Sequence, residues 1–133
     1  MSHRSEIEFR TSPPLTDAEL NELFADSWDA HESRIFSSVL SRSLAYVCAY
    51  CEGQLVGFVN VAWDSGAHAF ILDTTVRRSF WRGGIGRELV RRAETEARLK
   101  GAQWLHVDFE AQLERFYQSC GFRPSLAGLI RLL

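Results

Sequence analysis

Three glycines and two arginines stand close together in residues 79–89, S-F-W-R-G-G-I-G-R-E-L. Glycine has no side chain, so the main-chain amides of residues 81–86 are open to close approach. From Ile85 onward apolar residues recur at helical spacing, and the first N–H groups of a helix have no partner within the helix. A helix start of this kind, flanked by arginines, predicts a site for an anion of the size of a diphosphate. The predicted contacts are Trp81, Arg82, Gly83, Gly84, Ile85, Gly86 and Arg87, with Arg77, Arg78 and Arg91 within reach.

Two common phosphate-binding motifs do not fit this stretch. A Walker loop ends in Gly-Lys-Ser or Gly-Lys-Thr, whereas Gly86 is followed by Arg87 and Glu88. A dinucleotide fingerprint needs Gly or Ala three residues after Gly86, where Leu89 stands, and it normally belongs to a much larger domain. The stretch therefore indicates a phosphate ligand of another kind.

Length, composition and charge limit the class of protein. The 133 residues fit one domain, 46% of them are hydrophobic and the net charge is −2, so neither disorder nor a nucleic-acid partner is favoured. No apolar run approaches the roughly 18 residues that a membrane span needs. The three cysteines are odd in number, and we see no signal peptide, so we expect free thiols. We therefore expect a soluble, cytoplasmic protein.

Cys48 and Cys51 form a C-x-x-C pair, which is the feature that suggests zinc or redox chemistry. No second pair completes a zinc site, and no helix start follows to lower a thiol pKa. We therefore expect buried thiols in a strand, and no metal.

The elements that position the glycine loop follow from capping signals and hydrophobic runs. Thr16 and Glu19 form a capping box at a helix start, and Lys100-Gly101 ends the helix that follows the loop. Near-continuous apolar runs predict strands that are covered on both faces. The expected strands are residues 7–10, 44–51, 55–63, 67–76 and 104–109, with a last strand in residues 126–133; the expected helices are a first one from Thr16, a weaker one over residues 34–42, one from Gly84 and one that ends at Gly121.

This order predicts a single α/β domain over residues 1–133, with a mixed central sheet flanked by helices. The crossover between residues 67–76 and 104–109 is long enough to make these two strands parallel neighbours. The glycine loop then lies at the carboxyl end of the first of them, where ligands of such sheets bind.

Residues 76–89, V-R-R-S-F-W-R-G-G-I-G-R-E-L, resemble the acyl-CoA loop of GNAT-type N-acetyltransferases. The family pattern is Arg or Gln, two residues, and Gly-x-Gly or Gly-x-Ala, just after a strand that ends in Val. Val76 and Gly84-Ile85-Gly86 match it, while Trp81 stands at the Arg/Gln position. Residues 114–122, E-R-F-Y-Q-S-C-G-F, resemble the family's second motif, a helix that carries Phe-Tyr and ends in Gly-Phe.

The resemblance implies a GNAT-like fold and the transfer of acetyl from acetyl-CoA directly to a primary amine of a small molecule or peptide. It implies that the pantetheine arm lies between two splayed parallel strands and pairs with the backbone at Thr74, Thr75 and Val76. The Val76 N–H would then polarise the thioester carbonyl. It also implies that Tyr117 lies beside the sulfur and protonates the departing thiolate. A homodimer is an expectation from the family alone.

The acceptor amine has to lose a proton, and Asp73 is the first candidate base. It is the single carboxylate in the apolar run F-I-L-D-T-T-V, where burial without a partner would raise its pKa toward a useful value. Loop N–H groups or an arginine that held this carboxylate would make it structural instead. Asp108, Glu110, His106 and an ordered water are the alternatives.

Three functions compete at this point. The first is an active N-acetyltransferase, and the second is a non-catalytic acyl-CoA-binding or sensing domain with the glycine loop intact and the acceptor site lost. The third is a nucleic-acid-binding module built on the arginines, which the net charge disfavours. Separately, the alternative role for Tyr117 is that of a core aromatic beside Phe116. For a cationic amine, the residues that suggest a pocket are Trp28, Trp63, Phe80, Asp26, Asp29 and Asp64.

Overall fold

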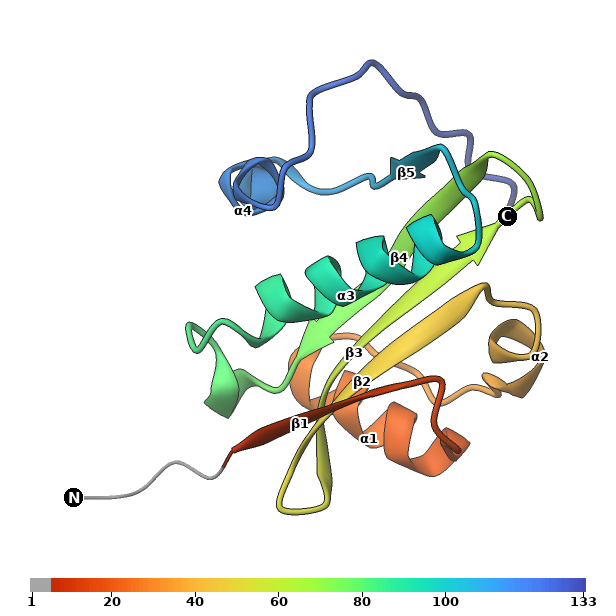
Figure 1. Cartoon of the computed structure of the whole chain (residues 1–133). Coiled ribbons are helices and arrows are strands. Elements are labelled where there is room, and N and C mark those ends of the chain that lie inside the picture. Colours follow the sequence, from red (N-terminus) through yellow and green to blue (C-terminus); the bar gives the residue numbers. More distant parts are fainter. Residues whose placement is uncertain (1–5) are drawn as a thin grey trace.

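The sheet has five strands in the order of the chain. The computed structural model describes residues 6–133, so residues 1–5 of the predicted domain lie outside the described residues. The first four strands pair antiparallel with their neighbours, and the fifth pairs parallel with the fourth (Figure 1). This is the mixed sheet with a parallel pair that the sequence predicts. The strands are β1 (Ile7–Thr11), β2 (Ala45–Cys51), β3 (Gln54–Trp63), β4 (His68–Val76) and β5 (Trp104–His106).

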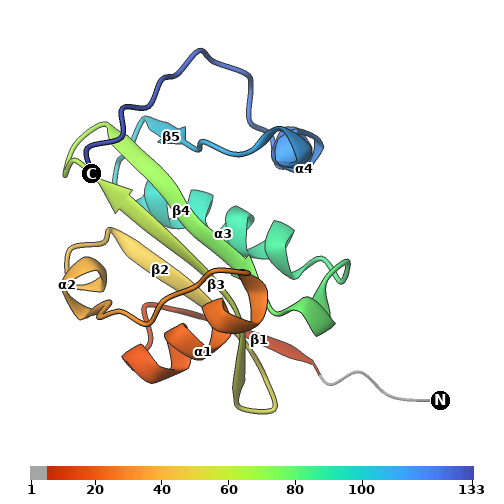
Figure 2. The ribbon, with the colours of Figure 1, turned by 180° about the vertical axis from the view of Figure 1, so that it is seen from behind.

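Helices cover both faces of the sheet. α3 (Ile85–Leu99) crosses one face, and α1 (Asp17–Ser27) and α2 (Ser37–Leu40) lie on the other, as the view from behind shows (Figure 2). α4 (Glu114–Ser119) belongs to the α3 side, because its Tyr117 packs in the core beneath α3. No helix within residues 6–133 has the length and apolar character that crossing a membrane requires.

The predicted capping box starts α1. The Thr16 hydroxyl accepts a hydrogen bond from the Glu19 N–H at 3.1 Å, and the Glu19 carboxylate accepts one from the Thr16 N–H, also at 3.1 Å. Both orphan donors at this helix end are therefore satisfied, which fixes where α1 begins.

Two apolar cores lie on opposite faces of the sheet. The core beneath α3 joins that helix to the central strands, and the core beneath α1 is centred on Phe24 and Phe58. Cys48 lies in the α1 core and Cys51 borders the α3 core, so the two thiols face opposite sides and do not form one metal site. Burial raises the pKa of the Cys48 thiol to about 12.

β4 and β5 separate soon after they meet. Their parallel register has three pairs and ends at Phe70 and His106. Beyond that point β4 carries a bulge, because its register with β3 shifts between Phe58 and Asn60, and Asp73 has a φ of +60° there. The strand ends therefore diverge on the side where the glycine loop begins.

Three predicted elements are shorter or absent. The helix expected over residues 34–42 is the single turn Ser37–Leu40, and the strand expected over 104–109 ends at His106 because the ladder with β4 ends there. The strand expected in residues 126–133 is wrong: this segment contains no strand and is not part of the five-stranded sheet.

Candidate functional site

The start of α3 is open and carries no side-chain cap. Gly84, the N-cap residue, has a φ of +83°, a conformation that a glycine adopts without strain. A Cβ atom added at Gly84 would meet nothing within 4 Å. The first hydrogen bond of the helix runs from the Glu88 N–H to the Gly84 carbonyl at 3.1 Å. The N–H groups of residues 85–87 therefore have no helical acceptor, and they lie at the positive end of the helix.

Gly86 has a different role, which is to bring α4 close to α3. A Cβ atom at Gly86 would lie 3.4 Å from the ring of Phe116 and 3.7 Å from Val76. The absence of a side chain therefore allows the aromatic ring of α4 to rest on the first turn of α3. This contact brings together the two motifs on which the family resemblance depends.

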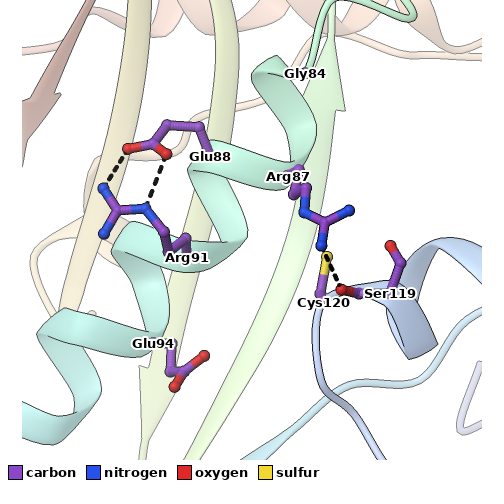
Figure 3. Close-up of a pocket in the computed structure, with 7 residues that line it drawn as sticks. All are labelled: Gly84, Arg87, Glu88, Arg91, Glu94, Ser119 and Cys120. Atoms are coloured by element: carbon purple, nitrogen blue, oxygen red, sulfur yellow. Dashed lines mark hydrogen bonds and ion pairs between the residues drawn. The ribbon is translucent and has the colours of Figure 1, made fainter.

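A hollow of about 280 Å³ opens between the first turns of α3 and the end of α4 (Figure 3). The Arg87 guanidinium reaches across it and donates to the Ser119 carbonyl at 2.8 Å. Arg91 is held by Glu88, which also binds Arg92 and whose pKa these two guanidinium groups lower to about 2. The residues that line the hollow are Gly84, Arg87, Glu88, Arg91, Glu94, Ser119 and Cys120.

Arg77 and Arg78 do not serve the glycine loop, which corrects the expectation that they lie within reach of the anion. The buried Arg77 forms an ion pair with Glu22 of α1 and donates to the Leu55 carbonyl at 3.0 Å. Arg78 binds Asp29 at 2.7 Å, and its N–H donates to the Asp26 carboxylate. Glu22 of α1 and Asp29, which follows α1, therefore bind the two guanidinium groups.

These pairs also remove the carboxylates of the suggested cation pocket. Asp26 and Asp29 are bound by the arginines, and Asp64 accepts from the N–H groups of Gly66 and His68 within its own turn. Trp28 stacks on Phe24, with ring centroids 4.2 Å apart. Trp63 and Phe80 border the other core, so these aromatic residues stabilise the fold and do not converge on one pocket.

Trp81 and Arg82 lead into the glycine loop. The Trp81 indole N–H donates to the Val76 carbonyl at 2.6 Å, and the Ser27 hydroxyl donates to the same oxygen at 3.0 Å. These bonds fix the end of β4. Arg82 is exposed with a φ of +66°, directly before Gly83. No signal in the sequence indicated the contact from Ser27, because that residue lies 49 positions away.

Tyr117 lies buried at the gap between β4 and β5. Its ring stacks on Phe109 at 4.9 Å and meets Phe116 and Phe122 edge to face. Burial raises the pKa of the Tyr117 phenol, which lies close to the Thr74 hydroxyl. The Thr74 oxygen is itself buried and has no hydrogen-bond partner within the described residues. The phenol of α4 thus faces β4 at the residues where the pantetheine arm is expected.

Asp73 occupies the bulge of β4. Its side chain is accessible to solvent and accepts no hydrogen bond from residues 6–133, so neither loop amides nor an arginine fixes it. Partial burial raises the pKa of the carboxyl group, and the charge of Arg34 lowers it to a smaller extent. The direction of this shift is the one that the sequence predicts.

The other base candidates lie around the same gap. His106 accepts or donates a hydrogen bond with His68 at 2.8 Å and stacks on Phe70. Asp108 lies near enough to Tyr117 to raise the phenol's pKa. Glu110 accepts a hydrogen bond from Gln112 at 2.6 Å. Within residues 6–133, no three His, Cys, Asp or Glu side chains gather in a way that could hold a metal ion.

Comparisons with known proteins identify the family and the fold of this chain. The model of the Acetyltransferase (GNAT) family matches residues 8–122. A GNAT-family acetyltransferase structure from Streptococcus pneumoniae TIGR4 is 22% identical, with a TM-score of 0.81 over 96% of this chain and 98% of that chain. Glucosamine-6-phosphate N-acetyltransferase from Arabidopsis thaliana is 14% identical, with a TM-score of 0.75 over 96% and 98%.

A third solved structure contains a coenzyme A derivative. It is AAC(6')-Iy in complex with the bisubstrate analogue CoA-S-monomethyl-acetylneamine, 18% identical, with a TM-score of 0.75 over 96% of this chain and 97% of that chain. Among curated proteins the search found no match. These structures share the fold of this chain, and the family match spans most of its length. The chain therefore belongs to the GNAT family of acetyltransferases.

Proposed function

We propose that the protein is an acetyl-CoA-dependent N-acetyltransferase that transfers acetyl directly to a primary amine of a small molecule or peptide in the cytoplasm. The observation that carries the proposal is the uncapped first turn of α3, which contacts α4 through Gly86 and Phe116, the neighbour of Tyr117. Coenzyme A carries a diphosphate that an anion site can bind, and its thiolate needs a proton when it leaves.

In this proposal the diphosphate of coenzyme A binds the N–H groups of residues 85–87. The hollow beside Gly84 and Arg87 receives the nucleotide end, because it is the hollow that adjoins this turn. The pantetheine arm runs into the gap between β4 and β5 and pairs with the backbone of residues 74–76. The thioester then lies between the Val76 N–H and the Tyr117 phenol.

Two proton transfers accompany acetyl transfer. The neutral amine attacks the thioester carbonyl carbon, a C–N bond forms and the C–S bond breaks. Asp73 accepts the proton that the amine loses, and Tyr117 donates a proton to the thiolate that leaves. The raised pKa of Asp73 makes its carboxylate a stronger base, and the absence of a bound partner among the described residues leaves it free to act.

The test is an amine screen. The protein is incubated with acetyl-CoA and pools of small-molecule amines and peptides, and mass spectrometry detects acetylated products while a thiol reagent reports free CoA. We expect at least one acetylated amine, with CoA released in equal amount. Bound CoA with no turnover across the pools would favour the acyl-CoA-binding alternative, and no binding of CoA would refute both readings.

A further inference from the structure

His68 and His106 form a pair of imidazoles that bridges the two parallel strands. His68 opens β4 and His106 ends β5, and the Nδ1 atom of His68 lies 2.8 Å from the Nε2 atom of His106. A hydrogen bond between two imidazoles has a proton on one nitrogen and a lone pair on the other, both aimed at the same point. Two ring nitrogens from different strands are therefore directed at one small volume of space.

The pair stands on the face of the sheet that is turned away from α3. Ala69 and Leu105, the strand neighbours of the two histidines, pack in the core beneath α3. Successive side chains of a strand point to opposite faces, so the imidazoles point away from that core. Both histidines are exposed. An ion from solution therefore reaches both nitrogens without any opening of the fold.

Neighbouring residues hold the pair in position. His106 stacks on Phe70, its register partner on β4, with ring centroids 4.6 Å apart and an angle of 17° between the ring planes. The main-chain N–H of His68 donates to the Asp64 carboxylate at 3.2 Å, which ties the start of β4 to the preceding turn and places a negative charge there. Ligands that are already in position lose less entropy when they bind an ion.

We propose that His68 and His106 bind a divalent transition-metal ion of the zinc class, and that the ion links β4 to β5. Imidazole nitrogen is a preferred ligand of Zn²⁺, Cu²⁺ and Ni²⁺, whereas Mg²⁺ and Ca²⁺ prefer oxygen. Water completes the coordination, because within residues 6–133 no third His, Cys, Asp or Glu side chain joins the pair. The inference does not depend on the proposed function.

The separation of the two nitrogens is close to what a shared ion requires. Zn–N bonds of about 2.0–2.1 Å at a tetrahedral angle place two nitrogens about 3.3–3.4 Å apart. The rings therefore part by roughly half an ångström from their 2.8 Å separation, which small rotations of exposed side chains supply.

The protons of the two rings are compatible with this role. An imidazole binds a metal through a nitrogen that carries no proton, so the ring proton lies on the other nitrogen. These other nitrogens are Nε2 of His68 and Nδ1 of His106, and neither has a hydrogen-bond partner within residues 6–133. Each can therefore carry its proton toward water while both lone pairs face the ion.

The ion would fasten a short ladder. β4 and β5 share three register pairs, and His68 belongs to the first pair and His106 to the last. A link between the two residues spans the whole ladder and opposes its separation next to the gap. An ion that binds only the folded chain also stabilises the fold by mass action. Sequence reasoning did not join the two histidines, because 38 positions separate them.

The test is titration calorimetry of the full chain with ZnCl₂, in a buffer that does not bind metals. We expect a single ion per chain with micromolar affinity, and no binding of Mg²⁺. Loss of an outer-shell partner alone weakens metal binding about 10–100-fold, so His68→Gln and His106→Gln should each weaken it at least about tenfold. Both positions are exposed, and circular dichroism checks that both variants fold.

The other two histidines of the chain are the matched controls. His31→Gln removes an imidazole that already forms a hydrogen bond with Asn21 of α1. His3→Gln removes the histidine that lies outside the described residues. We expect both variants to bind Zn²⁺ like the wild type.

Hydrogen exchange locates the ion. We expect Zn²⁺ to slow the exchange of the amides of residues 104–106 in the wild type and to leave it unchanged in His106→Gln. No binding by the wild type, or binding that persists in both His68→Gln and His106→Gln, would overturn the proposal. Half an ion per chain would also overturn it, because two copies would then share the ion. None of these measurements requires acetyl transfer, so they stand apart from the test of the proposed function.

Discussion

The Tyr117 phenol on α4 and the Thr74 hydroxyl on β4 lie close together where β4 and β5 separate, although the two residues are far apart in sequence. Both groups are buried, and the Thr74 oxygen has no hydrogen-bond partner within the described residues. A buried hydroxyl without a partner is costly, and a ligand that enters the gap would supply one.

Tyr117→Phe removes the proposed proton donor and keeps the ring that packs on Phe109. We expect unchanged affinity for acetyl-CoA and a loss of about 10²-fold in turnover, as general-acid chemistry predicts. Steady-state kinetics and calorimetry measure the two quantities. Tyr46→Phe is the control, because the Tyr46 hydroxyl donates to the Pro13 carbonyl far from the gap. Equal turnover in wild type and Tyr117→Phe would make Tyr117 a core residue only.

Asp73→Asn tests the base. Since the pKa of Asp73 is raised, wild-type turnover should fall as pH drops through that pKa, and the variant should lose this acidic limb together with about 10²-fold or more of its turnover. The raised pKa also means that the ionised carboxylate is less stable in the folded than in the unfolded chain. The variant should therefore keep or gain thermal stability at neutral pH.

Asp64→Asn is the matched control for that experiment, because hydrogen bonds from its own turn lower the pKa of Asp64. It should change stability slightly and leave the pH profile of turnover as it is. A folded Asp73→Asn variant that retains the acidic limb would assign the proton transfer to Asp108, Glu110, His106 or water.

Glu88→Gln tests the ion pairs beside the hollow. Folding lowers the pKa of the Glu88 carboxyl from its usual value of 4.5 to about 2. The stability that its ion pairs contribute is therefore fully present above pH 4.5 and is lost as the pH falls toward 2. We expect the variant to lose roughly 0.5–1 kcal/mol of unfolding free energy near neutral pH. The difference should vanish near pH 2. Denaturant titrations at several pH values measure it, and a difference that does not depend on pH would contradict this cause.

Gly57→Ala tests the packing between β3 and α3. A Cβ atom at Gly57 would lie 3.1 Å from both Ile85 and Leu89, which is too close for a relaxed contact. Overpacking of this kind costs about 1–3 kcal/mol. Since Ile85 begins α3, we also expect weaker CoA binding. Gly128→Ala, where nothing lies within 4 Å, should leave both quantities unchanged; an equally stable Gly57→Ala would show that α3 can move without cost.

The sequence predicted the five strands, the starts of α1 and α3 and the position of the glycine loop, because these depend on local patterns such as the capping box at Thr16 and the apolar spacing of α3. It could not predict which arginines face the loop, because Arg77 is drawn to Glu22 across 55 residues of sequence. The bulge at Asp73 was equally hidden, since a positive φ at an aspartate has no sequence signal of its own. The predicted strand in residues 126–133 was wrong because an apolar run alone does not show whether a segment pairs with the sheet.

The most direct test of the central claim is the affinity for CoA of Gly84→Glu compared with Gly101→Glu, measured by titration calorimetry. Gly84 and Gly101 lie at opposite ends of α3 with φ values of +83° and +86°, and a Cβ at either position meets nothing within 4 Å. Both variants therefore carry the same backbone strain. We predict that Gly84→Glu abolishes CoA binding, because a carboxylate then occupies the diphosphate site, while Gly101→Glu binds like the wild type. Unchanged affinity in a folded Gly84→Glu variant would contradict the site at the start of α3.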